Sequence, residues 1–221
     1  MIENLLYKLS IMLVPGLLAI TCHEVSHGYV ASRFGDPTAR MLGRLTLNPL
    51  KHIDIFGTLM LVVVGIGWAK PVPVVIQNLR NPKKDMIWVS AAGPVTNLVL
   101  ALVSALLLRL LLALPPGYGF VVQPLSYMAG FSIYINLLLA FFNMIPIPPL
   151  DGGRVLMGLL PYRQASTLGR LEPYGMMIII LLVFFTPIFS YLLMPLLMAG
   201  IRLLAGPYSA LVLNVANFRM M

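Results

Sequence analysis

The sequence predicts a polytopic α-helical membrane protein, with about five transmembrane helices and a short re-entrant β region after the first helix. Two features of composition indicate this class: 59% of the 221 residues are hydrophobic and only 10% are charged, whereas a soluble domain carries about a quarter charged residues. The third observation is a series of apolar segments long enough to cross a bilayer. We therefore expect a single membrane-embedded domain over residues 1–221.

The apolar segments define the expected helices. The first covers roughly residues 5–32, and later ones cover roughly 86–113, 125–147, 174–187 and 188–206. Most of them are separated by breaks rich in Pro, Gly or charge, at Pro115-Pro116-Gly117, Asp151-Gly152-Gly153 and Glu172-Pro173. The last two segments meet near Pro187, so residues 174–206 form either two passes or one bent unit.

Residues 33–85 differ from the rest of the chain. They are rich in turn formers, and their apolar stretches Leu59–Val64 and Val72–Ile76 are too short to span a bilayer. Both stretches also contain many β-branched residues, which favour strands. We therefore expect short strands or a re-entrant hairpin, held against protein or a water-filled cavity because open strand edges cannot face lipid.

The basic residues test this layout. With the N-terminus outside and five spans, 13 of the 15 Lys and Arg residues lie on the inner side, and only Lys8 and Arg109 lie outside. This bias follows the positive-inside rule and predicts a multi-pass protein of a prokaryotic cytoplasmic membrane, surrounded by membrane lipid. The basic residues form no dense block, so we expect no nucleic-acid partner.

The first motif that carries chemistry is His23-Glu24-Val25-Ser26-His27 in the first apolar segment. Residues four apart share a helix face, so His23 and His27 can bind one metal ion, and Glu24 can reach a water molecule on that ion. The alternative is a pair of polar residues on a packed helix face. Ionisable groups inside a membrane helix are costly and usually functional, which favours the metal site.

A third metal ligand must come from elsewhere, because catalytic zinc commonly has three protein ligands and one open position. Asp151 follows a segment with three prolines and precedes Gly152 and Gly153. The prolines forbid regular helix there, and the glycines allow tight turning. Irregular backbone near a bilayer is tolerated where it lines a protein cavity. Asp151 is therefore a candidate ligand, or alternatively a residue that caps the next helix.

Together these motifs resemble the site-2 protease family of intramembrane zinc metalloproteases. The first is His-Glu-x-x-His, and the second is Asn-x-x-Pro-x-x-x-Leu-Asp-Gly, which runs from Asn143 to Gly152. The stretch at residues 43–52 and Ala92-Gly93-Pro94-x-x-Asn97 also resemble family motifs. The chain is similar to the minimal branch of the family, because we find no room for a PDZ or CBS domain.

The resemblance implies zinc bound by His23, His27 and Asp151, with Glu24 as the catalytic base. The expected function is a zinc metalloendopeptidase that hydrolyses a peptide bond in or near the transmembrane segments of membrane-protein substrates. The tetrahedral oxyanion needs a donor besides zinc. Asn97 is our candidate, because its side-chain amide is uncharged and can donate. The alternative for Asn97 is a hydrogen bond between helices.

The main alternative function is a membrane metal-binding or transport protein that uses the same ligands. It leaves Glu24 without a role, because transport needs no general base, and transporters tend to have internal repeats, which we do not find here. His52 is a weaker candidate for an auxiliary role, and we expect it to be a surface loop histidine instead. Cys22 is expected to be a small packing residue, with a metal role as the alternative. The sequence identifies neither the substrate nor the oligomeric state.

Overall fold

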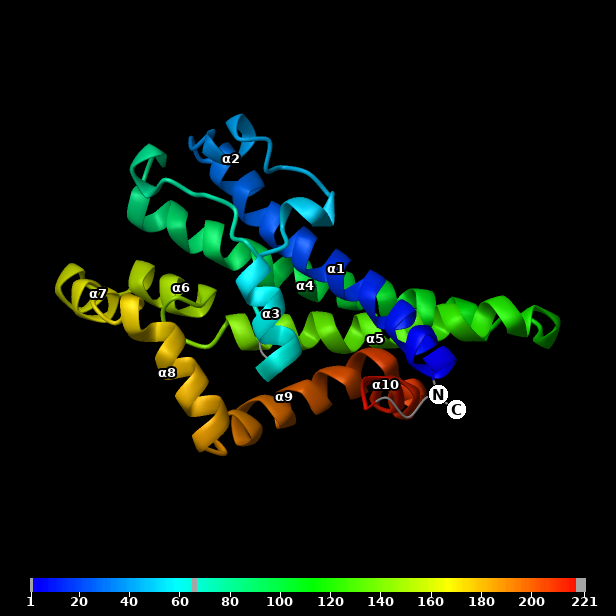
Figure 1. Cartoon of the computed structure of the whole chain (residues 1–221). Coiled ribbons are helices and arrows are strands. Elements are labelled where there is room, and N and C mark those ends of the chain that lie inside the picture. Colours follow the sequence, from blue (N-terminus) through cyan, green and yellow to red (C-terminus); the bar gives the residue numbers. More distant parts are fainter. Residues whose placement is uncertain (1, 65–66, 218–221) are drawn as a thin grey trace. The chain divides into compact units, whose positions relative to one another are not determined.

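The structure, a computed structural model, describes residues 2–64 and 67–217, and its helices are labelled in Figure 1. The chain divides into two compact units. The first comprises residues 1–19, 97–142 and 180–221, and the second comprises residues 20–96 and 143–179. The expectation of a single domain over residues 1–221 stays a prediction.

Helices make up most of the described chain. The longest are α1 (Ile2–Arg33), α4 (Pro82–Leu112), α5 (Gly119–Asn143) and α9 (Ile188–Ala205). The shorter ones are α2 (Thr38–Met41), α3 (Ile55–Val64), α6 (Asp151–Leu159), α7 (Tyr162–Gly169), α8 (Glu172–Phe185) and α10 (Ser209–Ala216). Short 3₁₀ turns lie at Pro49–Lys51, Ile76–Asn78, Pro116–Tyr118 and Gly206–Tyr208.

Several helices are suited to a membrane. Four stretches are long and apolar enough to cross one: Leu6–Arg33, Pro82–Leu112, Gly119–Asn143 and Ser190–Ala216. A fifth crossing results if α7 and α8, which are bent by 64° at their junction, count as one broken span. The predicted polytopic helical membrane protein is confirmed. The predicted segment 174–187 forms most of α8, whose 14 residues reach only about 21 Å, less than the bilayer core of about 30 Å.

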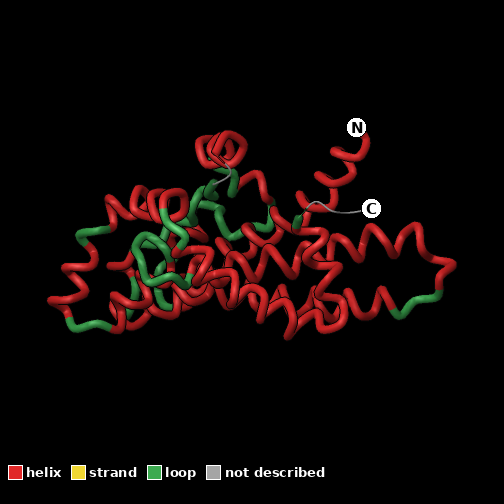
Figure 2. The backbone as a smooth tube through the Cα atoms, turned by 90° about the horizontal axis from the view of Figure 1, so that it is seen from below, coloured by secondary structure: helices red, strands yellow, loops and turns green. Residues whose placement is uncertain are grey.

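The predicted β region is wrong. Figure 2 shows no strand among the described residues, and the β contact found there is an isolated antiparallel bridge between Ile53 and Ala69. The stretch Leu59–Val64 lies in helix α3, and Val72–Ile76 runs through a loop into a 3₁₀ turn. The error has a physical cause, because a short apolar run does not distinguish a strand from a helix by periodicity.

Local hydrogen bonds explain the observed conformation of this region. Asp54 Oδ1 accepts the N–H of Gly57 at 2.7 Å and thereby caps the first turn of α3. The helix then satisfies its own backbone groups, which a lone strand in lipid does not. In the following loop, Pro71 and Pro73 have no N–H, so this segment cannot complete a ladder of backbone hydrogen bonds.

The first unit is an apolar helical core with polar contacts inside it. Its buried residues come from α4, α5, α9 and α10 and include Ala101, Ala105, Leu108, Ile133, Leu137, Leu197, Ile201 and Val212. Two side-chain hydrogen bonds join α4 to α5, between Asn97 and Asn136 at 2.8 Å and between Ser104 and Ser132 at 2.7 Å. Such bonds are a common means of helix association in membranes.

The second unit ties the loop after α3 to the end of α1. Asp36 is fully buried, and its carboxylate accepts the N–H of Val75 at 2.7 Å and the amide of Asn78 at 3.0 Å. Burial alone would raise the pKa of Asp36, but these bonds and those from Thr38 hold the pKa below its ordinary value. The ionised carboxylate therefore fixes residues 75–78 against the turn that ends α1.

Candidate metal centre

The two histidines lie in the second half of α1, within the candidate span Leu6–Arg33. Their rings pack edge to face, with centroids 4.7 Å apart. His23 is 7% exposed, and the side chain of His27 is 12% exposed. The two imidazoles therefore share one helix face, as their spacing predicts, and both are withdrawn from the surface.

Asp151, the first residue of α6, meets both histidines. Its Oδ2 lies 3.1 Å from Nε2 of His23 and 3.4 Å from Nε2 of His27, and the three donor atoms all fall within 4.8 Å of one another. Two ligand atoms at about 2.1 Å from a tetrahedral zinc ion are about 3.4 Å apart. The three residues therefore have the spacing of a zinc site, and no other such group occurs among the residues that the structure describes.

The charge of this cluster also fits a cation. Asp151 Oδ2 is buried and accepts no hydrogen bond of good geometry. Burial would raise the pKa of Asp151, but the facing rings of His23 and His27 hold it well below its usual range. The carboxylate is therefore ionised at neutral pH. A buried anionic oxygen that faces two ring nitrogens matches the oxygen and nitrogen ligands of a divalent metal.

The loop before α6 places Asp151. Residues 144–150 form no regular helix, as their prolines predict, and α6 begins at Asp151 itself. Gly152 and Gly153 lie inside this helix without a positive φ, so they do not provide the tight turn that we expected. Their lack of a side chain instead lets the start of α6 pack closely on the preceding loop, because a Cβ at Gly152 would collide with the backbone of Met144. Asp151 also lies in the first turn, where the helix dipole favours a carboxylate.

A backbone contact from α4 orients the second histidine. His27 Nδ1 lies 2.7 Å from the carbonyl oxygen of Val89. A carbonyl only accepts, so Nδ1 carries a proton, and Nε2 is the ring nitrogen that faces the cluster. Such contacts fix the tautomer and orientation of metal-binding histidines. The sequence gives no sign of Val89, because its contribution comes from the main chain.

Gly93 lets α4 approach the cluster. A Cβ at this position would lie 2.5 Å from Nε2 of His23 and 2.5 Å from Nε2 of His27. Real Cβ contacts are essentially never that short, so no larger residue fits without displacing the rings. The motif at 92–97 includes Gly93, but only the structure gives the physical reason for it.

Replacing Gly93 by Ala is expected to weaken zinc binding about tenfold or more, because the added methyl enters the space beside both ring nitrogens and overpacking costs about 1–3 kcal/mol. Competition with a chromophoric chelator measures this affinity. Gly16→Ala is the matched control on α1, since its Cβ would meet only Phe131, at 4.0 Å. Equal zinc affinity in the two variants would show that α4 does not border the metal.

Glu24 follows His23 directly and stands outside the group of three donors. Its Oε2 accepts the N–H of Val72 at 2.9 Å, and its side chain is partly exposed. The local sequence around Glu24 does not reveal this partner, because Val72 lies 48 residues further along the chain. The available signal was the Pro71-Val72-Pro73 pattern, in which only the central residue has an N–H.

Asn97 has two hydrogen bonds from its amide nitrogen. This fully buried residue donates to Asn136 Oδ1 at 2.8 Å and to the carbonyl oxygen of Ala19 at 3.2 Å. A side-chain amide carries two N–H groups, so both are used in contacts between helices, which is the alternative stated above. Its role as an oxyanion donor stays a prediction.

Two other candidate side chains lie outside the cluster. His52 is 2% exposed, so the expectation of a surface loop histidine is wrong. Its Nε2 lies 2.9 Å from the carbonyl oxygen of Thr46, because the loop folds back over the ring. Cys22 is partly buried and is not one of the three donors.

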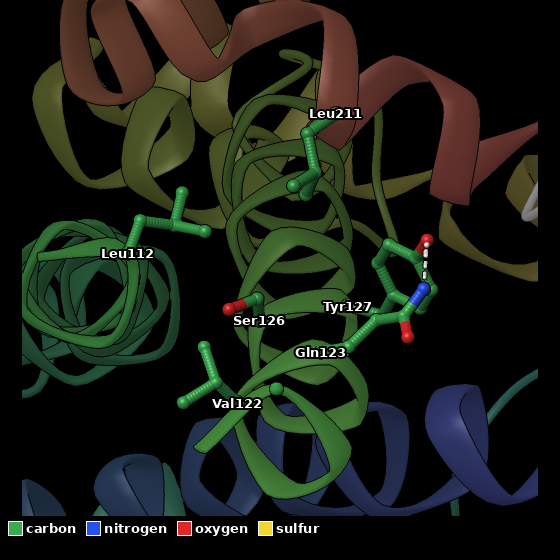
Figure 3. A pocket seen from close by; sticks show the side chains of 7 residues that line it. Leu112, Val122, Gln123, Ser126, Tyr127 and Leu211 are labelled. Atoms are coloured by element: carbon green, nitrogen blue, oxygen red, sulfur yellow. Dashed lines mark hydrogen bonds between the residues drawn. The ribbon is translucent and has the colours of Figure 1, made fainter. Parts of the chain in front are cut away.

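A pocket within the first unit has a different character. It has a volume of about 450 Å³ and is lined by Leu112, Gly119, Val122, Gln123, Ser126, Tyr127 and Leu211. Figure 3 shows its polar side chains, of which Gln123 donates to the hydroxyl of Tyr127 at 3.1 Å. These lining residues include no carboxylate or imidazole, so they offer neither the ligands of a metal nor a general base.

Known proteins match the chain in sequence. The family model of peptidase family M50 matches residues 116–186, a stretch that contains Asp151. A Bacillus subtilis (strain 168) protein named "Putative zinc metalloprotease YwhC" is 42% identical over 209 residues, which cover 89% of this chain and 91% of that protein. The chain belongs to peptidase family M50.

Other relatives are more distant. Rip2 of Mycolicibacterium smegmatis is 34% identical over 78% of this chain and 66% of its own length. MJ0611 of Methanocaldococcus jannaschii is 36% identical over 61% of this chain and 62% of its own length. Both carry the same description as the Bacillus protein. No solved structure matches the chain.

Membership of M50 confirms the resemblance to the site-2 proteases. The names of the relatives agree with zinc as the predicted cofactor, and so does the donor set of the cluster. The apolar helices agree with a multi-pass integral membrane protein.

Proposed function

We propose that this chain is an intramembrane zinc metalloendopeptidase, which hydrolyses a peptide bond in or near the transmembrane segments of membrane-protein substrates. The observation that carries the proposal is the approach of Asp151 Oδ2 to Nε2 of His23 at 3.1 Å and of His27 at 3.4 Å. Glu24 adds a carboxylate beside this cluster without belonging to it. Three ligands and a separate carboxylate are what a hydrolytic zinc site needs.

The residues have distinct roles in this proposal. His23, His27 and Asp151 would hold the ion and leave its fourth position open. Bound zinc supplies Lewis-acid activation of a water molecule and of the scissile carbonyl. Glu24 accepts the proton of the attacking water and returns it to the leaving amine. The carbonyl of Val89 keeps the ring of His27 in the tautomer that presents Nε2.

The place of these residues along α1 supports hydrolysis inside the bilayer. His23 and His27 precede Arg33, the basic end of the candidate span, by about 15 Å and 9 Å along the helix axis. A basic residue at the end of a span is typical of the cytoplasmic side. We therefore infer that the reaction takes place in the cytoplasmic half of a prokaryotic cytoplasmic membrane.

A reconstituted system tests the function. The purified chain is placed in liposomes with a single-pass reporter protein, and both reporter cleavage and zinc uptake are measured. We expect cleavage that stops when a chelator removes zinc and returns when zinc is added. Zinc uptake without cleavage would instead favour the transport alternative, and cleavage by zinc-free protein would overturn the metalloprotease.

The substrate helix is expected to control the rate. A carbonyl inside a helix is already hydrogen-bonded, so the substrate must unwind near the scissile bond, and groups freed in lipid cost several kcal/mol each. One Gly costs a helix about 1 kcal/mol relative to Ala, so reporters with one Leu→Gly change near the cleavage site should have about fivefold higher kcat/KM. Leu→Ala reporters of equal length are the control, and equal rates for the two would exclude unwinding as a barrier.

A further inference from the structure

We propose that the Pro71-Val72-Pro73 segment is a positioning device for the catalytic base, in which the N–H of Val72 holds Oε2 of Glu24. The inference rests on the proposed function, because it assigns a task to the base of that reaction. The contact that carries it is the 2.9 Å hydrogen bond from Val72 N to Glu24 Oε2. Val72 itself is 7% exposed, and the bond is partly buried.

The sequence around Val72 restricts the direction of this N–H. Pro71 and Pro73 have no N–H and a fixed φ, so Val72 supplies the one backbone donor of the three residues. Lys70 and Val72 each precede a proline, which disfavours the helical region for both. The segment therefore presents a single donor from backbone that has few other conformations.

Packing and hydrogen bonds fix the segment in place. The side chain of Val72 lies directly on α1. A Cβ at Gly28, one turn after Glu24, would come within 2.7 Å of Val72 Cγ1. Before the prolines, Arg44 Nη2 donates to the carbonyl oxygen of Lys70 at 2.9 Å. After them, the N–H of Val75 donates to Asp36 at 2.7 Å. The N–H that faces Glu24 is therefore held by one hydrogen bond before the prolines, by another after them, and by the packing of Val72 on α1.

This arrangement gives the two carboxylate oxygens of Glu24 different roles. With Oε2 fixed by Val72, Oε1 is the oxygen left to accept the proton of water and to return it to the leaving amine. A free Glu side chain has many rotamers, and ordering it costs about 1.5–2 kcal/mol. The hydrogen bond from Val72 orders the Glu24 side chain before the substrate binds. Loss of this bond should therefore lower kcat and leave KM nearly unchanged.

Removal of the single N–H tests the device. Replacement of the Pro71–Val72 amide by an ester, through incorporation of the α-hydroxy analogue of valine, deletes the donor and keeps the side chain; Val72→Pro deletes it by ordinary mutagenesis. We expect kcat to fall about tenfold to a hundredfold, the range for a hydrogen bond to a charged group, with KM within about threefold of wild type and unchanged zinc content. Val74→Pro, which places a proline nearby and keeps the N–H of Val72, should stay near wild type.

A second measurement needs no catalysis. In the zinc-free protein, the Val72 amide should exchange its hydrogen at least about tenfold faster in Glu24→Ala than in wild type. The amide of Val75, which is bonded to Asp36, is the internal control and should not change. Because the neighbouring prolines have no amide hydrogen, the signal of this stretch comes from few sites.

Each result has a defined meaning. A wild-type chain without zinc-dependent cleavage would overturn the proposed function and this inference with it. If the wild type cleaves, an ester variant with normal kcat, or an equal exchange rate of Val72 in Glu24→Ala, would overturn the positioning role alone. A rise in KM at normal kcat would make the segment a substrate contact, and a loss of zinc would make it a support of the metal site; both contradict the proposal.

Discussion

Replacement of Glu24 by Gln is expected to abolish proteolysis while the zinc content stays at the wild-type level. Glu24 is not among the three residues whose donor atoms converge, so its replacement leaves the ligands intact. Gln cannot take a proton from water, and loss of a general base lowers the rate by roughly 10²–10⁴-fold. The amide oxygen of Gln can still accept the N–H of Val72, so the contact between α1 and the loop at Val72 should remain.

The decisive measurement combines reporter cleavage and zinc per chain in one sample. Glu172→Gln is the control, because Glu172 pairs with Arg154 at 3.1 Å in a partly exposed ion pair, and such pairs contribute about 0–1 kcal/mol. This control should retain its activity. A Glu24→Gln variant that still cleaves, or that loses zinc, contradicts the assignment of Glu24 as the base.

Replacement of Asp151 by Ala is expected to remove both zinc and activity. The carboxylate supplies the oxygen that His23 and His27 face, and without it two neutral rings remain. Loss of a contact outside the ligand shell lowers metal affinity by about 10–100-fold, so loss of the charged ligand should exceed about 100-fold. The helix itself should survive, because α6 is also held by close packing of its first turn on the preceding loop.

Zinc stoichiometry after dialysis against a weak chelator, together with reporter cleavage, measures this effect. Asp54→Asn is a matched control: Asp54 caps α3 through the N–H of Gly57, and Asn is an equally good N-cap. The control should bind zinc normally. If Asp151→Ala also keeps its zinc, Asp151 is only the first-turn acid of α6, and another residue completes the site.

The comparison of the two acids separates catalysis from binding. Glu24→Gln should lose activity and keep zinc, whereas Asp151→Ala should lose both. This pattern follows from the positions of the side chains, since only Asp151 lies within ligand distance of both histidines. A shared loss of zinc in the two variants would mean that Glu24 also supports the metal.

Helix periodicity and composition were enough for much of the fold and the site. The low charge and long apolar runs predicted the membrane class, because a chain with so few charged residues must bury its surface in lipid. The spacing of His23 and His27 predicted a shared helix face, because residues four apart meet on any α-helix. The prolines before Asp151 predicted a break in the helix, since proline lacks the helical donor.

Short segments and long-range contacts were decided only by the tertiary structure. The run Leu59–Val64 forms a helix because Asp54 caps it, and its composition alone fits a strand equally well. The hydrogen bond of Val72 to Glu24 and the closeness of Gly93 to the histidines join residues far apart in sequence. Such contacts depend on how helices and loops pack, and a local pattern of residue types contains no information about the distance between two backbones.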